Sequence, residues 1–128
     1  MKFYNTATGK KEDFIPNSKN LGLYICGPTV YSDTHLGHAK SYVSFDILKR
    51  WLVYRGYGVR HIQNFTDVSD ETAINSSKEG MDELSFTKKY ETEFLDKMRL
   101  LSNTDASKYT RASDFVEKIA KETKKLLD

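Results

Sequence analysis

The sequence predicts an α/β fold in which a parallel βαβ unit is followed by helices. The apolar run LGLYIC at 21–26 is followed by a periodic segment at 37–55 and a second apolar run, GVRHIQNF, at 58–65. Glycine marks the joints of this unit, at Gly27 and at Gly56. Two strands connected in sequence through a helix are parallel, with a right-handed crossover.

The first elements can be justified in order. Residues 1–20 are an irregular lead, and 21–26 is a buried strand that the Gly27-Pro28 pair ends. In the segment 37–55 the four-residue rhythm of one helix face is carried by three large apolar residues: Phe45, Leu48 and Leu52. Gly56 stands where a left-handed residue commonly caps a helix.

The remainder of the chain, 81–128, has helical periodicity. One apolar stripe recurs at four positions: Tyr90, Phe94, Met98 and Leu101. A second stripe consists of Phe115, Val116, Ile119, Ala120, Thr123, Leu126 and Leu127. Amphipathic helices usually bury such faces, so we expect both stripes in the core, with Ser113 as the N-cap of the last helix.

Length and charge limit the function classes. With 128 residues the chain is one domain or part of one, and its 20 basic and 18 acidic side chains permit nucleic-acid contact without arguing for it. No apolar run approaches a membrane span, and the first residues lack the apolar centre of a signal peptide. A single cysteine cannot form an internal disulfide. We therefore expect a cytoplasmic protein without a membrane partner.

The stretch CGPTVYSDTHLGHAK, at 26–40, follows the first strand and opens the helix. In open parallel sheets, ligands bind beyond the carboxyl ends of the strands, near helix N-termini that favour phosphate. His35 and His38 can add ring N–H donors there, and Gly37 has no Cβ to keep a ligand away. The alternative is that His35 only caps the helix and His38 lies on a helix face.

Cys26 also has two interpretations. A cysteine that ends a buried strand is usually a small apolar group, but its thiol could also bind a metal. Zinc needs about four ligands, and the chain has one cysteine and three histidines without a recognisable spacing. The chain cannot close a standard zinc site by itself.

The segment NFTDVSD, at 64–70, follows the second strand and should reach the same sheet edge. It could contribute to a site, or form a polar turn in which Asp67 or Ser69 caps the next helix. For Ser69 the capping role is favoured.

Taken together, these segments resemble the N-terminal part of cysteinyl-tRNA synthetases over essentially the whole chain, fading after about Gly80. The resemblance is carried by FYNTATGKKEDFIP, by LYICGPTVYSDTHLGHAKSYVSFDILKRWLVYRGYGV and by HIQNFTDVSDETAINSSKEG. The nine fixed letters of Cys-Gly-Pro-Thr-Val-Tyr and His-x-Gly-His make it specific.

The resemblance implies the N-terminal half of a Rossmann-like class I nucleotide-binding fold, and an enzyme that joins cysteine to ATP and transfers it to tRNA(Cys). It implies that Cys26 is the first of four zinc ligands, and that Thr66 lies beside the amino acid. His35 and His38 match the signature that holds ATP, with Mg²⁺, and stabilises its reacting phosphates. The positions implied for ATP binding are Gly27, Thr29, His35, Gly37 and His38.

By the same resemblance, 1–128 is a single partial catalytic domain, with a nucleotide-binding half at 1–80 and a helical extension at 81–128. The sequence lacks the family's Lys-Met-Ser-Lys-Ser loop and its other three zinc ligands. We expect the chain alone to be catalytically incomplete, with a second chain or self-association covering the exposed half-sheet. Two alternatives remain: a non-catalytic relative that binds ATP or metal, and a ligase that joins cysteine to an amino-sugar.

Overall fold

The structure is a computed structural model that describes residues 1–127. Its centre is a three-stranded sheet of β3 (Asn20–Ile25), β4 (Gly58–Phe65) and β5 (Lys108–Arg111), in the order β3-β4-β5. Both pairings are parallel, and Ile25 of β3 lies opposite Gln63 of β4. The predicted parallel βαβ unit is confirmed, because α1 (Leu36–Tyr54) connects β3 to β4.

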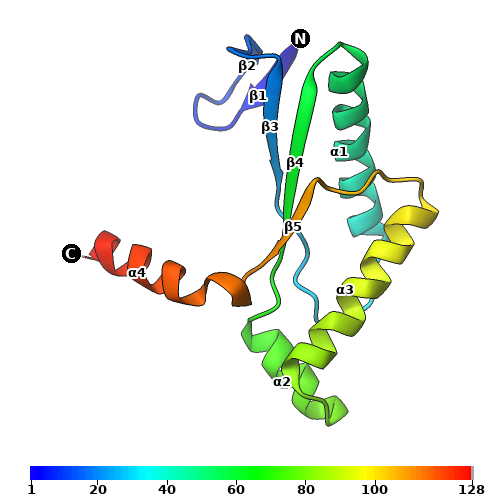
Figure 1. Ribbon diagram of the computed structural model, residues 1–128, viewed down its shortest axis with the longest axis vertical. Helices are drawn as coiled ribbons and strands as arrows, with labels where there is room; N and C mark the ends of the chain where they lie inside the picture. Colours follow the sequence, from blue (N-terminus) through cyan, green and yellow to red (C-terminus); the bar gives the residue numbers. More distant parts are fainter. Residues whose placement is uncertain (128) are drawn as a thin grey trace.

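The segment before β3 is more regular than its residue pattern alone indicated. Residues 1–20 contain an antiparallel hairpin of β1 (Lys2–Asn5) and β2 (Lys10–Asp13), seen at one end of the molecule in Figure 1. The hairpin sequences are mostly polar and exposed, so they lack the alternating apolar pattern by which strands are recognised.

Two helices follow β4 before the chain returns to the sheet. These are α2 (Asp70–Glu79) and α3 (Glu83–Leu100). Ser69 caps α2 as predicted, because its hydroxyl oxygen accepts a 3.1 Å hydrogen bond from the Thr72 backbone N–H. Gly56, just after α1, has a left-handed φ of 84°, which confirms the expected glycine position.

The expectation that 81–128 is helical throughout is wrong at β5. The strand is only four residues long, KYTR, and three of these are polar or charged, so neither periodicity nor apolar content reveals it. Parallel pairing with β4 forms it: Gln63 lies opposite Tyr109, and Phe65 opposite Arg111.

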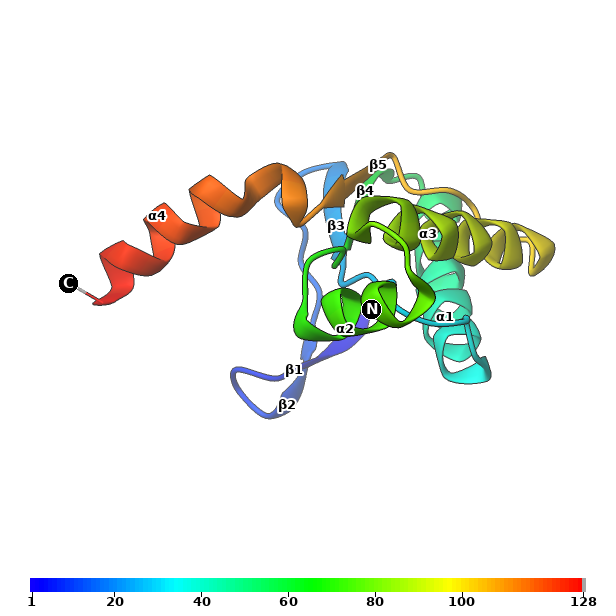
Figure 2. The same ribbon diagram turned by 90° about the horizontal axis from the view of Figure 1, so that it is seen from below.

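The chain ends with η1 (Ser113–Phe115) and α4 (Val116–Leu127). The expected burial of its apolar stripe is wrong, since no residue of α4 is buried. Figures 1 and 2 both show α4 leading away from the sheet and from the other helices. The predicted N-cap is also wrong: the Ser113 hydroxyl donates to Asp67 Oδ2, at 2.6 Å, instead of capping a helix.

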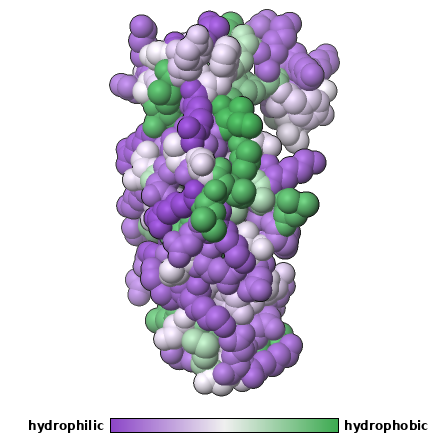
Figure 3. Space-filling view, turned by 90° about the vertical axis from the view of Figure 1, so that its right-hand side faces the viewer, coloured by the Kyte–Doolittle hydropathy of each residue, from purple (hydrophilic) through white to green (hydrophobic). Residues whose placement is uncertain are grey.

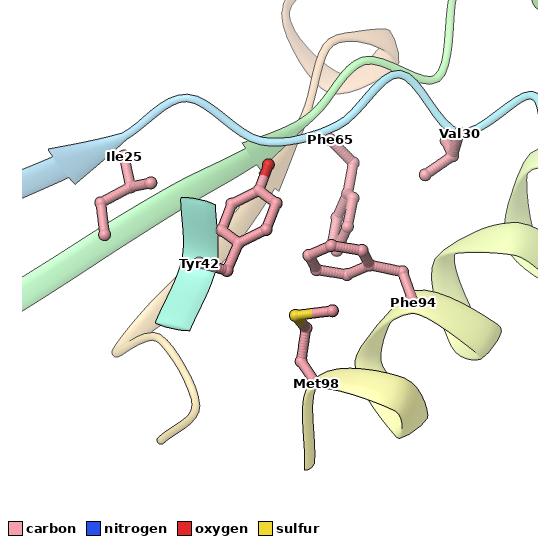
Figure 4. Packing of buried hydrophobic residues seen from close by; sticks show 6 residues of the cluster. All are labelled: Ile25, Val30, Tyr42, Phe65, Phe94 and Met98. Carbon is pink, nitrogen blue, oxygen red and sulfur yellow. The ribbon is translucent and has the colours of Figure 1, made fainter. Parts of the chain in front are cut away.

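Helices α1 and α3 pack on the same side of the sheet, as Figure 2 shows. Tyr42 of α1 and Phe94 and Met98 of α3 point toward Phe65 of β4 in the core (Figure 4). The stripe predicted on α3 is therefore buried at its centre. Leu101, which was expected in the core, lies after the helix and is exposed. Phe45 of α1 is exposed as well.

Several apolar side chains remain at the surface. Figure 3 shows a strip of them on the side of the molecule that α1 and α3 form. Exposed apolar residues of these helices include Leu36, Ile47, Trp51 and Leu100. On the uncovered face of the sheet, Tyr24 is 65% exposed. None of the helices within residues 1–127 is both long and apolar enough to cross a membrane.

Candidate functional site

The loops after β3 and β4 run side by side beyond the carboxyl ends of the strands. Val30 N–H donates to the Thr66 carbonyl, at 3.2 Å, and Thr66 N–H donates to the Pro28 carbonyl, at 3.0 Å. Thr29 and Thr66 form a parallel bridge. The structure thus brings together two segments that the sequence placed at one sheet edge.

Gly27 is required at this point by a close backbone approach. A Cβ on Gly27 would lie 1.4 Å from the Asn64 carbonyl oxygen, a distance at which no side chain can exist. The Gly27 N–H donates to Asn64 Oδ1, at 2.9 Å. Glycine therefore permits the first loop to lie directly against the end of β4.

Asn64 is a site residue that the sequence reasoning missed. Its Oδ1 also accepts from the Tyr24 hydroxyl, at 2.8 Å, and its Nδ2 donates to Thr66 Oγ1, at 3.3 Å. One amide thus holds the Gly27 turn, β3 and Thr66 in register. The signal was its position in NFTD, two residues before Thr66 at the end of the second strand, where a side chain can reach both strand ends.

Tyr42 is a second residue that was missed. Its hydroxyl donates to the Cys26 carbonyl, at 3.1 Å, and its ring lies 6.5 Å from that of His38. Because Tyr42 lies one helical turn after His38, it connects the start of α1 to the end of β3. The Cys26 thiol itself is exposed, and its nearest hydrogen-bonding contact is the Gly27 carbonyl, at 3.8 Å.

His35 and His38 lie at the N-terminus of α1, as predicted. His35 is the N-cap: its Nδ1 accepts from the Gly37 N–H, at 3.1 Å, while the His35 N–H donates to His38 Nδ1, at 3.4 Å. The capping role is therefore real. It does not exclude a ligand, because an occupied Nδ1 acceptor places the ring proton of each neutral imidazole on Nε2.

The two rings stack with centroids 3.9 Å apart and planes 18° from parallel. Burial, and to a lesser extent the proximity of His35, lowers the pKa of His38 and favours its neutral form. Gly37 makes this stacking possible, since a Cβ there would come within 2.9 Å of His35 Cε1. The pair presents N–H donors beside the positive end of a helix dipole, an arrangement suited to an anion.

Asp67 does not line this site and does not cap α2. It is 2% exposed, and its carboxylate accepts from both the N–H and the hydroxyl of Ser113, at 3.0 and 2.6 Å. It therefore links the loop after β4 to the turn after β5. Nearby, Arg111 at the end of β5 forms a two-point ion pair with the buried Glu91 of α3.

The residues present do not fit a complete zinc site. In the part of the chain that the structure describes, no group of three histidine, cysteine, aspartate or glutamate side chains comes close enough to hold a metal ion. Cys26 could supply one thiolate ligand from an exposed position, but one ligand does not satisfy zinc.

Comparisons with known proteins agree on one family. Residues 14–128 match the family described as tRNA synthetases class I (C) catalytic domain. The chain is 40% identical, over 129 residues, to a cysteine–tRNA ligase of Dehalococcoides mccartyi and 41% identical, over 130 residues, to one of Finegoldia magna. It is 40% identical to the chloroplastic/mitochondrial cysteine–tRNA ligase CPS1 of Zea mays.

Each of these matches covers 100% of this chain but only 28%, 28% and 23% of the relatives. Among solved structures, the chain is similar to the agnB2 LeuRS of Agrobacterium radiobacter K84, in a ternary complex with tRNA and LeuAMS. That match has a TM-score of 0.64 and 22% identity, and covers 77% of this chain and 13% of the other. At this identity the likeness concerns the fold.

Proposed function

The chain belongs to the family of class I (C) tRNA synthetase catalytic domains, and from this premise we propose that it forms part of the active site of a cysteine–tRNA ligase. The proposed reaction has two steps. Cysteine attacks the α-phosphorus of ATP, so that cysteinyl-adenylate forms and pyrophosphate leaves, and the cysteinyl group then passes to tRNA(Cys). The support is the family, the names of the relatives and the geometry at the ends of β3 and β4.

The single observation that carries the ATP assignment is the stacked His35–His38 pair at the N-terminus of α1. Both imidazoles use Nδ1 as an acceptor within the helix cap, so Nε2–H is left to donate to phosphate oxygens. Donors aimed at charge that develops on the phosphates lower the barrier to adenylate formation. We assign triphosphate stabilisation to His35 and His38, with Mg²⁺ accompanying ATP.

The neighbouring loop residues complete this assignment. Gly27, Thr29 and Gly37 are proposed to line the nucleotide site, because the first two lie in the loop after β3 and Gly37 lies in the first turn of α1. Thr66 is proposed to lie beside the cysteine substrate, since it bridges Thr29 across the two loops. Cys26 is proposed as one metal ligand, and the described residues do not supply a complete set of ligands with it.

We take residues 1–128 as one partial catalytic domain in which β5 joins the 81–128 segment to the nucleotide-binding sheet. The proposed partners are ATP, cysteine and tRNA(Cys). The proposed location of the protein is the cytoplasm. A second chain or a second copy is proposed to cover the sheet face on which Tyr24 is exposed.

The proposal is tested with a chimera in which this chain replaces the matching segment of the Dehalococcoides mccartyi ligase. The chimera should catalyse cysteine-dependent exchange of pyrophosphate into ATP. His38→Ala should lower the exchange rate by roughly a hundredfold to a thousandfold, because a preorganised donor is lost. Lys78→Ala, an exposed position on α2, is the matched control and should leave the rate unchanged.

The 128-residue chain alone should bind ATP weakly and show no exchange, since it offers donors on one side of the triphosphate only. Robust exchange by a monomer of this chain would contradict its assignment as an incomplete catalyst. A folded chimera that binds ATP through His38 and shows no exchange would instead favour a binding module.

A further inference from the structure

A small cavity lies beneath the sheet, between β4, α1 and α3. It has a volume of about 20 Å³. Its apolar walls include Ile25, Phe94 and Met98, and its polar walls include His61 and Gln63 of β4. A cavity of this size accommodates about one water molecule, since one water needs roughly 10–15 Å³ of free volume.

Buried nitrogen atoms of His61 and Gln63, on the β4 side of the cavity, have no partner among the described residues. His61 is 6% exposed and Gln63 is 4% exposed. Neither ring nitrogen of His61, nor Nε2 of Gln63, forms a hydrogen bond with any residue between 1 and 127. A buried polar group without a partner typically costs about 1–3 kcal/mol, so a native structure rarely leaves several such atoms together.

The two side chains can share one ligand because of their spacing. They are two residues apart on one strand, so both side chains extend to the same face of the sheet. Two further residues that line the cavity, Asp46 and Asn103, bring oxygen atoms that can accept hydrogen bonds. The lining thus combines N–H donors from β4 with acceptors from α1 and the loop after α3.

We propose that this cavity binds one ordered water molecule that bridges the His61 ring and the Gln63 side-chain amide. The Gln63 N–H donates to the water oxygen, and the neutral His61 ring makes one further hydrogen bond with the same water. Water fits this lining because it can accept two hydrogen bonds and donate two, within the volume available. The ligand is small and neutral. The proposed function does not depend on it.

The charges around His61 agree with a neutral ring. Burial and the positive charge of Lys49 lower its pKa, and the negative charge of Asp46 acts in the opposite direction. The other ionisable groups that line the cavity are Tyr42, Asp105 and Tyr109. Tyr42 also donates to the Cys26 carbonyl, so one residue of the cavity lining contacts the start of the loop at the candidate site.

The test is detection of the water by NMR on the 128-residue chain at neutral pH. Long-lived water should give cross-relaxation peaks to the His61 ring protons and to the Gln63 side-chain amide. The oxygen-17 relaxation dispersion of the solvent should report long-lived water as well. The same cross peaks should be present in Tyr42→Phe. Their presence excludes magnetisation transfer through the exchangeable proton of the Tyr42 hydroxyl.

The variant that removes the polar lining is His61→Phe combined with Gln63→Met. This double variant should lose these cross peaks, and its dispersion amplitude should fall by the contribution of about one water molecule. Asn75→Met on α2, outside the cavity, should retain the cross peaks and the full amplitude. Absence of the peaks in the wild-type chain overturns the proposal without any variant. An unchanged dispersion amplitude in the folded double variant, or a direct His61–Gln63 hydrogen bond seen by scalar coupling, overturns it too.

Discussion

The Tyr42 hydroxyl donates a 3.1 Å hydrogen bond to the backbone carbonyl of Cys26. The contact joins residues 16 positions apart and ties the first helix to the end of the first sheet strand. Because His38 lies one turn before Tyr42 on α1, the same helix fixes the two imidazoles relative to the Cys26 loop. The candidate site is thus held by a hydrogen bond from the core.

Tyr42→Phe should lower the free energy of unfolding by about 1 kcal/mol, because the Cys26 carbonyl loses its donor while the buried ring remains. Urea denaturation of the 128-residue chain measures this loss. Tyr54→Phe is the matched control, since Tyr54 lies on the same helix and is exposed. Equal losses in the two variants would show that the Tyr42 hydrogen bond does not stabilise the fold.

Gly27→Ala should destabilise the chain by about 3 kcal/mol, because its Cβ would overlap the Asn64 carbonyl oxygen and force the two loops apart. Gly22→Ala tests the same substitution in β3, where a Cβ meets nothing within 4 Å, and should change stability by less than about 1 kcal/mol. Both values follow from urea titrations. A tolerated Gly27→Ala would mean that the loops are not in backbone contact.

Arg111→Ala should cost about 3 kcal/mol, since it leaves the Glu91 carboxylate, whose side chain is 5% exposed, with only the Lys88 ammonium as its charged partner. Thermal or urea unfolding measures the loss. Arg99→Ala removes an exposed arginine that pairs with Asp96 and Asp105, and should lower the free energy of unfolding much less, because exposed ion pairs are screened by water. Similar losses in both variants would contradict a special contribution from the buried pair.

Stability should fall as the pH decreases below about 6.5, because His61 has a lowered pKa in the folded chain. In that range the unfolded chain binds a proton that the folded chain does not, so acid favours unfolding. His61→Phe should reduce the difference between urea midpoints at pH 7.5 and pH 5.5. The pKa of His38 is also lowered. The same pair of urea midpoints, measured for His38→Phe, shows how much of the pH dependence His38 contributes.

An NMR titration of the His61 ring checks the same prediction directly. The expected result is a pKa below the ordinary histidine value of about 6.5. A pKa at or above that value would contradict it, because protonation of the His61 ring would then not destabilise the folded chain in acid.

The sequence alone determined the βαβ unit and the position of the candidate site. The apolar run, the periodic helix and the second apolar run define β3, α1 and β4 through local patterning, and parallel topology then places Cys26, His35, His38 and Thr66 beyond the same sheet edge. The nine fixed letters of Cys-Gly-Pro-Thr-Val-Tyr and His-x-Gly-His indicated the protein family. These features are predictable because each depends on neighbouring residues in the chain.

The tertiary structure decided what depends on contacts between distant segments. Strand β5 forms because a short polar segment pairs with β4, and Ser113 bonds Asp67 across 46 positions instead of capping a helix. The periodic pattern of α4 predicts an apolar helix face, but no residue of α4 is buried. Burial requires a second surface against which that face can pack, and periodicity does not encode such a surface. Asn64 and the cavity at His61 likewise emerge only when the strands are assembled, since hydrogen-bond satisfaction is a property of the packed chain.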